Sequence, residues 1–89
     1  MKNKYIQNKK VIQSKIGDEV VMLDMDTGFY FGLNSVASKI WGKLEKEVSF
    51  EEIISDLLNE YKIDKLTCEN ETKFFLDQLL DKNIIKEVT

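Results

Sequence analysis

The spacing of apolar residues changes partway along this 89-residue chain, and that change constrains the fold more than any other feature. Before Asn34, apolar side chains tend to alternate with polar ones, which is the period of two that a β-strand requires. From Asn34 onward they recur every three or four residues, so they gather on one face of a helix. No proline, repeat or low-complexity tract indicates a linker. We therefore predict one α+β domain over residues 1–89, with strands first and helices second.

Three strands are predicted in the first third of the chain. Residues 5–16 are a loose candidate, and the turn signal Gly17-Asp18 separates them from a second strand at residues 19–25. Another turn at residues 26–28 leads into a third strand at residues 29–33. Because both connections are short, we expect the three strands to form an antiparallel meander.

The third predicted strand is rich in aromatic residues. Alternation puts Phe29, Phe31 and Leu33 on one face, and Tyr30 and Gly32 on the other. If this strand lies at a sheet edge, its unpaired amides and carbonyls can recruit an extended peptide. Glycine allows a second backbone to approach closely, and tyrosine offers a flat amphipathic contact. The alternative is an edge that the protein's own tail protects.

The first two helices have clear starting signals. Asn34 or Ser35 is the expected N-cap of the first helix, which should end near Glu47. Its buried stripe comprises Val36, Ala37, Ile40, Trp41 and Leu44. Ser49 begins the second helix with a capping box, because its hydroxyl can accept from the amide of Glu52 while that carboxylate reaches back.

A third helix is predicted from Thr67 or Asn70 to Lys82, with Asn83 in the left-handed conformation at its end. Its buried stripe comprises Thr72, Phe75, Leu76, Leu79 and Leu80. Phe74 lies away from the centre of that stripe, so the core does not explain it. The remaining apolar residues should add a short strand or cover the core; they are Ile84, Ile85 and Val88. We also expect Met22 and Met25 in the core, beside Trp41.

Composition excludes several classes of function. The chain has no histidine and therefore lacks the usual general base and the commonest metal ligand. Its single cysteine, Cys68, cannot form an internal disulfide and has no activating partner. The carboxylates, including Asp24 and Asp26, are interpreted as turn, cap and solvated-face residues. We therefore predict no catalytic residue, no metal ligand and no cofactor. No apolar run is long enough to cross a bilayer, so we expect a cytoplasmic protein that does not contact a membrane.

Segment 24–41, DMDTGFYFGLNSVASKIW, resembles the strand-turn-strand-helix signature of the pyrroloquinoline-quinone biosynthesis protein D (PqqD) family. Members often read as an aspartate-rich turn, a glycine, two aromatics, Leu-Asn, and then a helix of small residues carrying Ile-Trp. Residues 49–54 and 75–80, the latter leading into Ile84-Ile85, are similar to the rest of that pattern. The resemblance covers residues 17–88 and depends on the order and spacing of several segments.

The resemblance implies a winged-helix-like recognition element for ribosomally made precursor peptides, with a three-stranded antiparallel sheet followed by a three-helix bundle. In that family the leader peptide adds as a further strand to the third strand and lies in a groove against the third helix. The residues carried over are Phe29, Tyr30, Phe31, Gly32 and Leu33 from the strand, and Lys73, Phe74, Asp77 and Leu80 from the helix. Lys73 and Asp77 also have the spacing of a solvated ion pair. The family usually has an apolar residue at Lys73 and a small or aliphatic one at Phe74.

Stand-alone members of this family often serve lasso-peptide pathways, in which they hand the leader to a separate peptidase and then to a cyclase. The implied partners are therefore the precursor leader and a leader peptidase or modifying enzyme of the same pathway. One alternative is a peptide chaperone for a radical SAM enzyme. Another is an assembly subunit that contacts its enzyme and never touches the leader.

A DNA-binding winged helix is the rival interpretation, because three helices beside a strand hairpin also make that shape. Charge argues against it. All thirteen basic residues are lysine, so the arginine fork that grips phosphates and guanine edges is missing. Five lysines lie in residues 1–16 without an acid, but the helix at residues 50–60 carries four acids and no base. Phosphates would repel that helix, so we predict no nucleic-acid partner.

Overall fold

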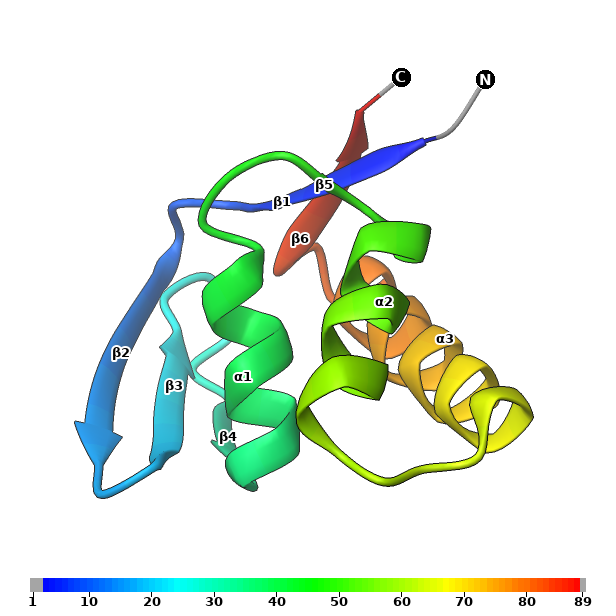
Figure 1. The fold of residues 1–89 in the computed structure, drawn as a ribbon. Helices are drawn as coiled ribbons and strands as arrows, with labels where there is room; N and C mark the ends of the chain where they lie inside the picture. Colours follow the sequence, from blue (N-terminus) through cyan, green and yellow to red (C-terminus); the bar gives the residue numbers. More distant parts are fainter. Residues whose placement is uncertain (1–2, 89) are drawn as a thin grey trace.

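Two three-stranded antiparallel sheets and three helices make up the protein in our computed structural model, which describes residues 3–88 (Figure 1). Met1, Lys2 and Thr89, at the ends of the expected domain, lie outside the described residues. One sheet has the strand order β2-β3-β4, and the other has the order β5-β1-β6. Helix α1 packs on β3 and β4, while α2 packs on α3. The predicted α+β fold, with the meander preceding three helices, is confirmed.

The β2-β3-β4 sheet is the predicted meander. Its strands are β2 (Val11–Ile16), β3 (Glu19–Asp24) and β4 (Tyr30–Leu33). Gly17 (φ 65°) and Gly28 (φ 77°) occupy the left-handed region that glycine accommodates, which explains both turns. Strand β3 ends at Asp24, one residue before the predicted end. Met25 consequently stands in the turn with 62% of its surface exposed, so its predicted place in the core was wrong.

The prediction of one strand over residues 5–16 was also wrong, because that segment is divided between the two sheets. The second sheet consists of β1 (Lys4–Gln7), β5 (Val48–Ser49) and β6 (Ile85–Val88). The Gln7 amide donates to the Leu44 carbonyl and the Asn8 amide donates to the Ile84 carbonyl, each at 2.9 Å. These long-range bonds end β1 and send the chain toward β2. The C-terminal tail does form a short strand, as predicted, and it pairs with β1 (Figure 1).

Helices α1 (Ser35–Lys43) and α2 (Phe50–Glu60) begin where the sequence predicted. The Asn34 side chain accepts from the Ala37 amide at 2.8 Å and therefore caps α1. The capping box of Ser49 and Glu52 at the start of α2 is complete. Helix α1 ends at Lys43, short of the predicted Glu47, because the following residues lead directly into β5.

Helix α3 (Lys65–Asp81) begins two residues before the earlier predicted start. Asp64 is its N-cap and accepts from the Thr67 amide at 3.1 Å. The first turn has only Cys68 buried and its other apolar residue, Leu66, exposed, so apolar periodicity did not reveal it. The other end agrees with the prediction, since Lys82 is the C-cap and Asn83 adopts a left-handed φ of 57°. None of the helices within residues 3–88 has both the length and the apolar composition needed to span a bilayer.

The core joins the inner face of the meander to the helices and the small sheet. Its most deeply buried apolar side chains are Met22, Leu44, Ile53, Leu57, Leu76, Ile84 and Ile85. Trp41 and Met22 lie there, as predicted. Burying a side chain of this size contributes about 1.5–3 kcal/mol to folding. This core holds β4 and α3 at a defined spacing.

Candidate functional site

Strand β4 forms an open edge of its sheet. It pairs with β3 on one side and with no other strand among residues 3–88. The C-terminal strand, which could have protected this edge, pairs with β1 in the other sheet. The main-chain groups along the outer side of β4 are therefore available to another chain.

The hydrogen-bond pattern determines which backbone groups of β4 face outward. The Asp24 amide donates to the Phe29 carbonyl at 2.9 Å, so that pair is bonded across the sheet. Bonded and non-bonded pairs alternate along an antiparallel ladder. By this alternation Phe31 bonds inward to β3, whereas the amides and carbonyls of Tyr30 and Gly32 point toward the open edge.

Ser38 of α1 fixes the far end of β4. Its hydroxyl accepts from the Val20 amide at 2.9 Å and donates to the Leu33 carbonyl at 3.1 Å. The Leu33 carbonyl therefore faces β3, as the ladder alternation requires. One buried hydroxyl thus couples β3, β4 and α1 at the point where the strand enters the helix.

A groove of about 430 Å³ runs between β4 and α3. Phe31 and Leu33 line it from the strand, while Phe75 and Leu79 line it from the helix. The remaining lining residues are Tyr30, Gly32, Asn34, Ala37, Gln78 and Lys82. The open edge therefore lies beside a furrow that exposes apolar and polar groups in similar measure, an arrangement in which an added strand can place alternate side chains.

Lys82 supplies a charge at one end of this groove. Its ammonium lies 5.3 Å from the centroid of the Phe29 ring and 5.7 Å from that of Phe31. The two ring centroids are 6.3 Å apart. Both distances from the ammonium are within the range of a cation–π contact, which is about 6 Å. The aromatic rings thus hold the ammonium beside the start of β4.

Asp24 connects the turn before β4 to the end of α3. Its carboxylate is 1% exposed and accepts from the Asp26 amide and the Thr27 hydroxyl, both at 3.0 Å, and from Lys10 at 3.3 Å. Burial raises the pKa of Asp24, but these hydrogen bonds and the charge of Lys10 outweigh it and leave the pKa below its ordinary value. Lys10 also donates to the Lys82 carbonyl at 2.9 Å. Asp24 was predicted as a turn, cap or solvated-face residue; it is the last residue of β3, and its buried carboxylate accepts hydrogen bonds from the turn that follows.

Lys73 and Asp77 do not line the groove beside β4. They form an i,i+4 ion pair of 3.2 Å with both side chains exposed, as their spacing predicted. They border a separate hollow beside Tyr5 and Phe50. Partial burial, and then the negative charge of Glu87, raise the pKa of Tyr5 in this hollow. The structure thus separates these two predicted site residues from the predicted strand.

Phe74 lies on another part of α3 and is 66% exposed. It lines a second hollow of about 530 Å³, walled by α1, α3 and the connection between α2 and α3. That hollow and the β4 groove share Asn34, Ala37, Phe75 and Gln78. The two hollows therefore adjoin, and the wall at Phe74 belongs to the one that does not border β4.

The helix residues that line the β4 groove differ from those that the resemblance implied. They are Phe75, Gln78, Leu79 and Lys82, whose spacing of three, four and seven residues places them on one helical face. The helical stripe predicts Phe75 and Leu79 as core residues. A side chain at the border of a buried stripe can both pack inward and line a groove, and periodicity does not separate these roles. Leu80 packs, partly buried, against the core.

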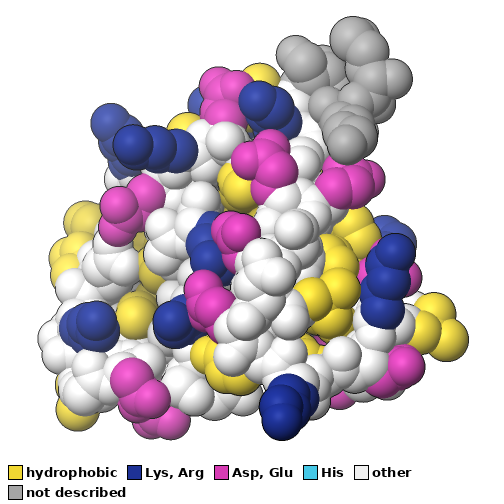
Figure 2. Space-filling view, in the orientation of Figure 1, with side chains coloured by type: hydrophobic (Ala, Val, Ile, Leu, Met, Phe, Trp, Pro, Cys, Tyr) yellow, Lys and Arg dark blue, Asp and Glu magenta, His cyan; other side chains and the backbone are white. Residues whose placement is uncertain are grey.

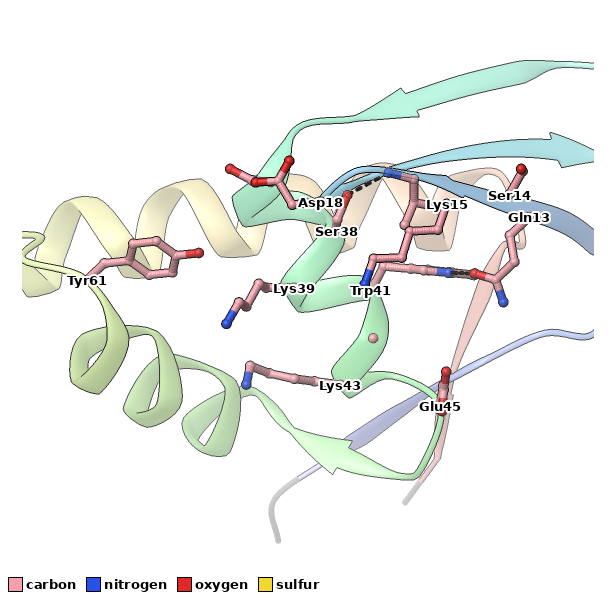
Figure 3. Close-up of a pocket in the computed structure, with 13 residues that line it drawn as sticks. Gln13, Ser14, Lys15, Asp18, Ser38, Lys39, Trp41, Lys43, Glu45 and Tyr61 are labelled. Carbon is pink, nitrogen blue, oxygen red and sulfur yellow. Dashed lines mark hydrogen bonds between the residues drawn. The ribbon is translucent and has the colours of Figure 1, made fainter.

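The opposite edge of the sheet, β2, has different surroundings. Another hollow, of about 800 Å³, lies between the β2–β3 hairpin and α1 (Figure 3). Most of its lining residues are polar or charged, but apolar atoms make up most of its exposed wall. Trp41 presents its indole N–H there to the Gln13 side chain at 2.5 Å. Lys39 and Lys43, which border it, already pair with acids of α2. Size alone therefore does not mark it as a peptide site.

Charges of both signs are interspersed over the face formed by α1 and α2 (Figure 2). Lys39 pairs with Glu60 at 3.0 Å, and Lys43 pairs with Asp56 at 3.3 Å. The hydrogen bond and charge of Glu60 raise the pKa of Lys39, and the hydrogen bond from Lys39 lowers the pKa of Glu60. This face offers no continuous basic surface of the kind that phosphate binding requires.

The fold and the site together define a small winged-helix-like α+β domain with an unpaired strand edge beside a furrow along its last helix. Residues 19–85 match the family model described as coenzyme PQQ synthesis protein D (PqqD). The chain therefore belongs to the PqqD family, as its signature segments indicated.

Solved structures provide two further relatives. TbiB1 in complex with the TbiA(beta) leader peptide is 38% identical, with a TM-score of 0.83, and the match covers 91% of this chain and 94% of that one. A lasso peptide synthetase B1 complexed with the leader peptide is 20% identical, with a TM-score of 0.80 and coverage of 92% and 96%. The second likeness supports the fold alone. No curated protein matches the chain.

Proposed function

We propose that this chain binds the leader segment of a ribosomally synthesised precursor peptide, which adds as an antiparallel strand to β4. The observation that most supports this proposal is the open edge of β4 beside the furrow along α3. The chain is also 38% identical to a protein whose structure was solved in complex with a leader peptide. The leader remains a separate molecule, so its recognition is a binding event that needs no catalytic group.

Main-chain bonds would set the register of the leader. Tyr30 and Gly32 present their amides and carbonyls to the open edge, so the leader bonds to every second residue of β4. Gly32 has open space where a Cβ would stand, so the face of the sheet is uncovered at that position. These bonds do not depend on the leader's side chains, and selectivity therefore has to come from the furrow.

Leader side chains would alternate between the furrow and the outer face of the sheet. Those directed toward α3 would meet Phe31, Leu33, Phe75 and Leu79, which favour apolar partners. A leader that continues past the end of β4 would reach the wall at Phe74. We therefore propose that strand addition and apolar anchoring act together.

We further propose that the bound leader is delivered to processing enzymes of a lasso-peptide type, first a leader peptidase and then a cyclase. The support is family membership and the 38% identity to TbiB1. On this proposal the chain itself is not an enzyme, and it acts in the cytoplasm, where its precursor is made. A radical SAM modifying enzyme is the alternative recipient within the same family.

Isothermal titration calorimetry tests the binding step, with the TbiA(beta) leader peptide as the probe. We expect a dissociation constant on the order of micromolar to tens of nanomolar, because ordering a flexible leader offsets part of the contact energy. A scrambled peptide of the same composition is the control. Equal binding of the scrambled peptide, or no binding of either, would remove the basis for leader recognition.

A cleavage assay tests delivery separately. The leader peptidase of the same pathway should process the precursor faster when this chain is present. An assembly subunit that never touches the leader would bind the peptidase yet give no calorimetric signal with leader alone. The two measurements therefore distinguish a leader carrier from a plain subunit.

A further inference from the structure

Lys82 is the one side chain charged at neutral pH that lines the β4 groove within the described residues. It forms no salt bridge with an acid in residues 3–88. Contacts at its backbone and at its side-chain terminus nevertheless define the position of Lys82. Its carbonyl accepts from Lys10 at 2.9 Å, and its ammonium lies over Phe29 and Phe31. A fixed cation without a counter-charge is thus placed at one end of an otherwise uncharged groove.

The groove has a direction along β4. Lys82 lies beside Phe29 and Phe31, at the start of the strand, whereas Phe75 and Ala37 line both the groove and the adjoining second hollow. Lys82, the C-cap of α3, lies seven positions after Phe75, a rise of about 10 Å along the helix axis. Side chains on one face of a strand recur about every 7 Å. The distance between the cation and the apolar end therefore corresponds to one or two such repeats of a leader strand.

We propose that Lys82 is a specificity-determining residue that recognises an acidic side chain of the bound leader and so fixes its register along β4. This inference rests on the proposed function. In an antiparallel leader, the residues nearest Lys82 are the C-terminal ones of the docked segment. The recognised sequence therefore carries an apolar residue that faces Phe75 and Leu79, followed by an aspartate or glutamate two or four positions later. The even spacing follows because both side chains face α3.

Selection from a displayed library of random 12-residue peptides tests this pairing without knowledge of the natural precursor. Peptides enriched on the wild-type protein should carry the acid at a fixed even distance after an apolar residue. Peptides enriched on Lys82→Glu should carry lysine or arginine at the same place. Replacing the acid of a selected peptide by its amide should weaken wild-type binding about fivefold, the upper range for an exposed ion pair. The same replacement should not change binding to Lys82→Gln.

Lys86→Gln, on the exposed face of β6, is the matched control and should retain the wild-type preference. Circular dichroism verifies that each variant is folded. The selected peptides could bind the Tyr30→Pro variant more weakly than wild type and yet carry no preferred acid. That result would refute the role of Lys82 and leave strand addition to β4 intact. If no selected peptide depends on β4, both the inference and the proposed function are overturned.

Discussion

Replacing Tyr30 by proline tests whether the leader bonds to the outer edge of β4. The Tyr30 amide points away from β3, so proline removes a donor that the sheet itself does not use. The Tyr30 carbonyl remains, and one intermolecular hydrogen bond is lost. A hydrogen bond of this kind contributes about 0.5–1.5 kcal/mol, which corresponds to a roughly two- to thirteenfold weaker dissociation constant. Calorimetry with the TbiA(beta) leader peptide measures this change in the dissociation constant.

Tyr30→Ala is the matched control, because it removes the same side chain but keeps the amide. The comparison that matters is therefore between the proline and alanine variants. Phe31→Pro provides a second check, since the Phe31 amide faces β3 and its loss should lower the free energy of unfolding in urea. Equal leader affinity of Tyr30→Pro and Tyr30→Ala, with both folded, would refute strand addition at this edge.

Three further predictions concern residues around the furrow. The pKa of Asp24 is lower in the folded protein than in the unfolded chain, where it is about 3.9. The ionised carboxylate therefore stabilises the folded state fully above the unfolded-state pKa. This stabilisation is lost as the pH falls through the pKa of the folded state. Asp24→Asn should therefore have a lower free energy of unfolding than wild type near pH 7. Urea denaturation at about pH 3 should show a smaller difference in that free energy, and the same difference at both pH values would contradict this prediction. Lys73→Gln and Asp77→Asn should each change leader affinity by less than about twofold in calorimetry, because their exposed ion pair lies outside the groove. Phe74→Ala should weaken a leader that extends past β4 by about two- to tenfold, yet leave unchanged a leader truncated at the end of the strand.

Local signals predicted much of the fold. The Ser49 capping box, the Asn34 cap and the glycine turns lie where the sequence placed them, because each depends on residues at most a few positions apart. The Asp64 cap was missed since the first turn of α3 has no apolar stripe to mark it. The division of residues 5–16 was missed because bonds to Leu44 and Ile84, far along the chain, create it.

The candidate site was only partly predictable for the same reason. Alternation put Phe29, Phe31 and Leu33 on one face of the third strand and Tyr30 and Gly32 on the other. Phe31 and Leu33 do face inward, whereas Phe29 precedes β4 and is exposed. Which face of α3 meets that strand depends on how the helix rotates against the core. The resemblance implied Lys73 and Asp77, whereas the packed structure brings Phe75, Gln78, Leu79 and Lys82 to the groove.

The amino-acid sequence by itself determined the order of strands and helices, their caps and turns, and the family to which the chain belongs. These follow from periodicity and from interactions within a few residues, which a linear pattern records. Only the tertiary structure decided that the C-terminal strand pairs with β1, that β4 keeps an open edge, and that Lys82 meets Phe29 and Phe31. Those outcomes depend on contacts between distant segments, whose geometry is set by the packing of the whole core.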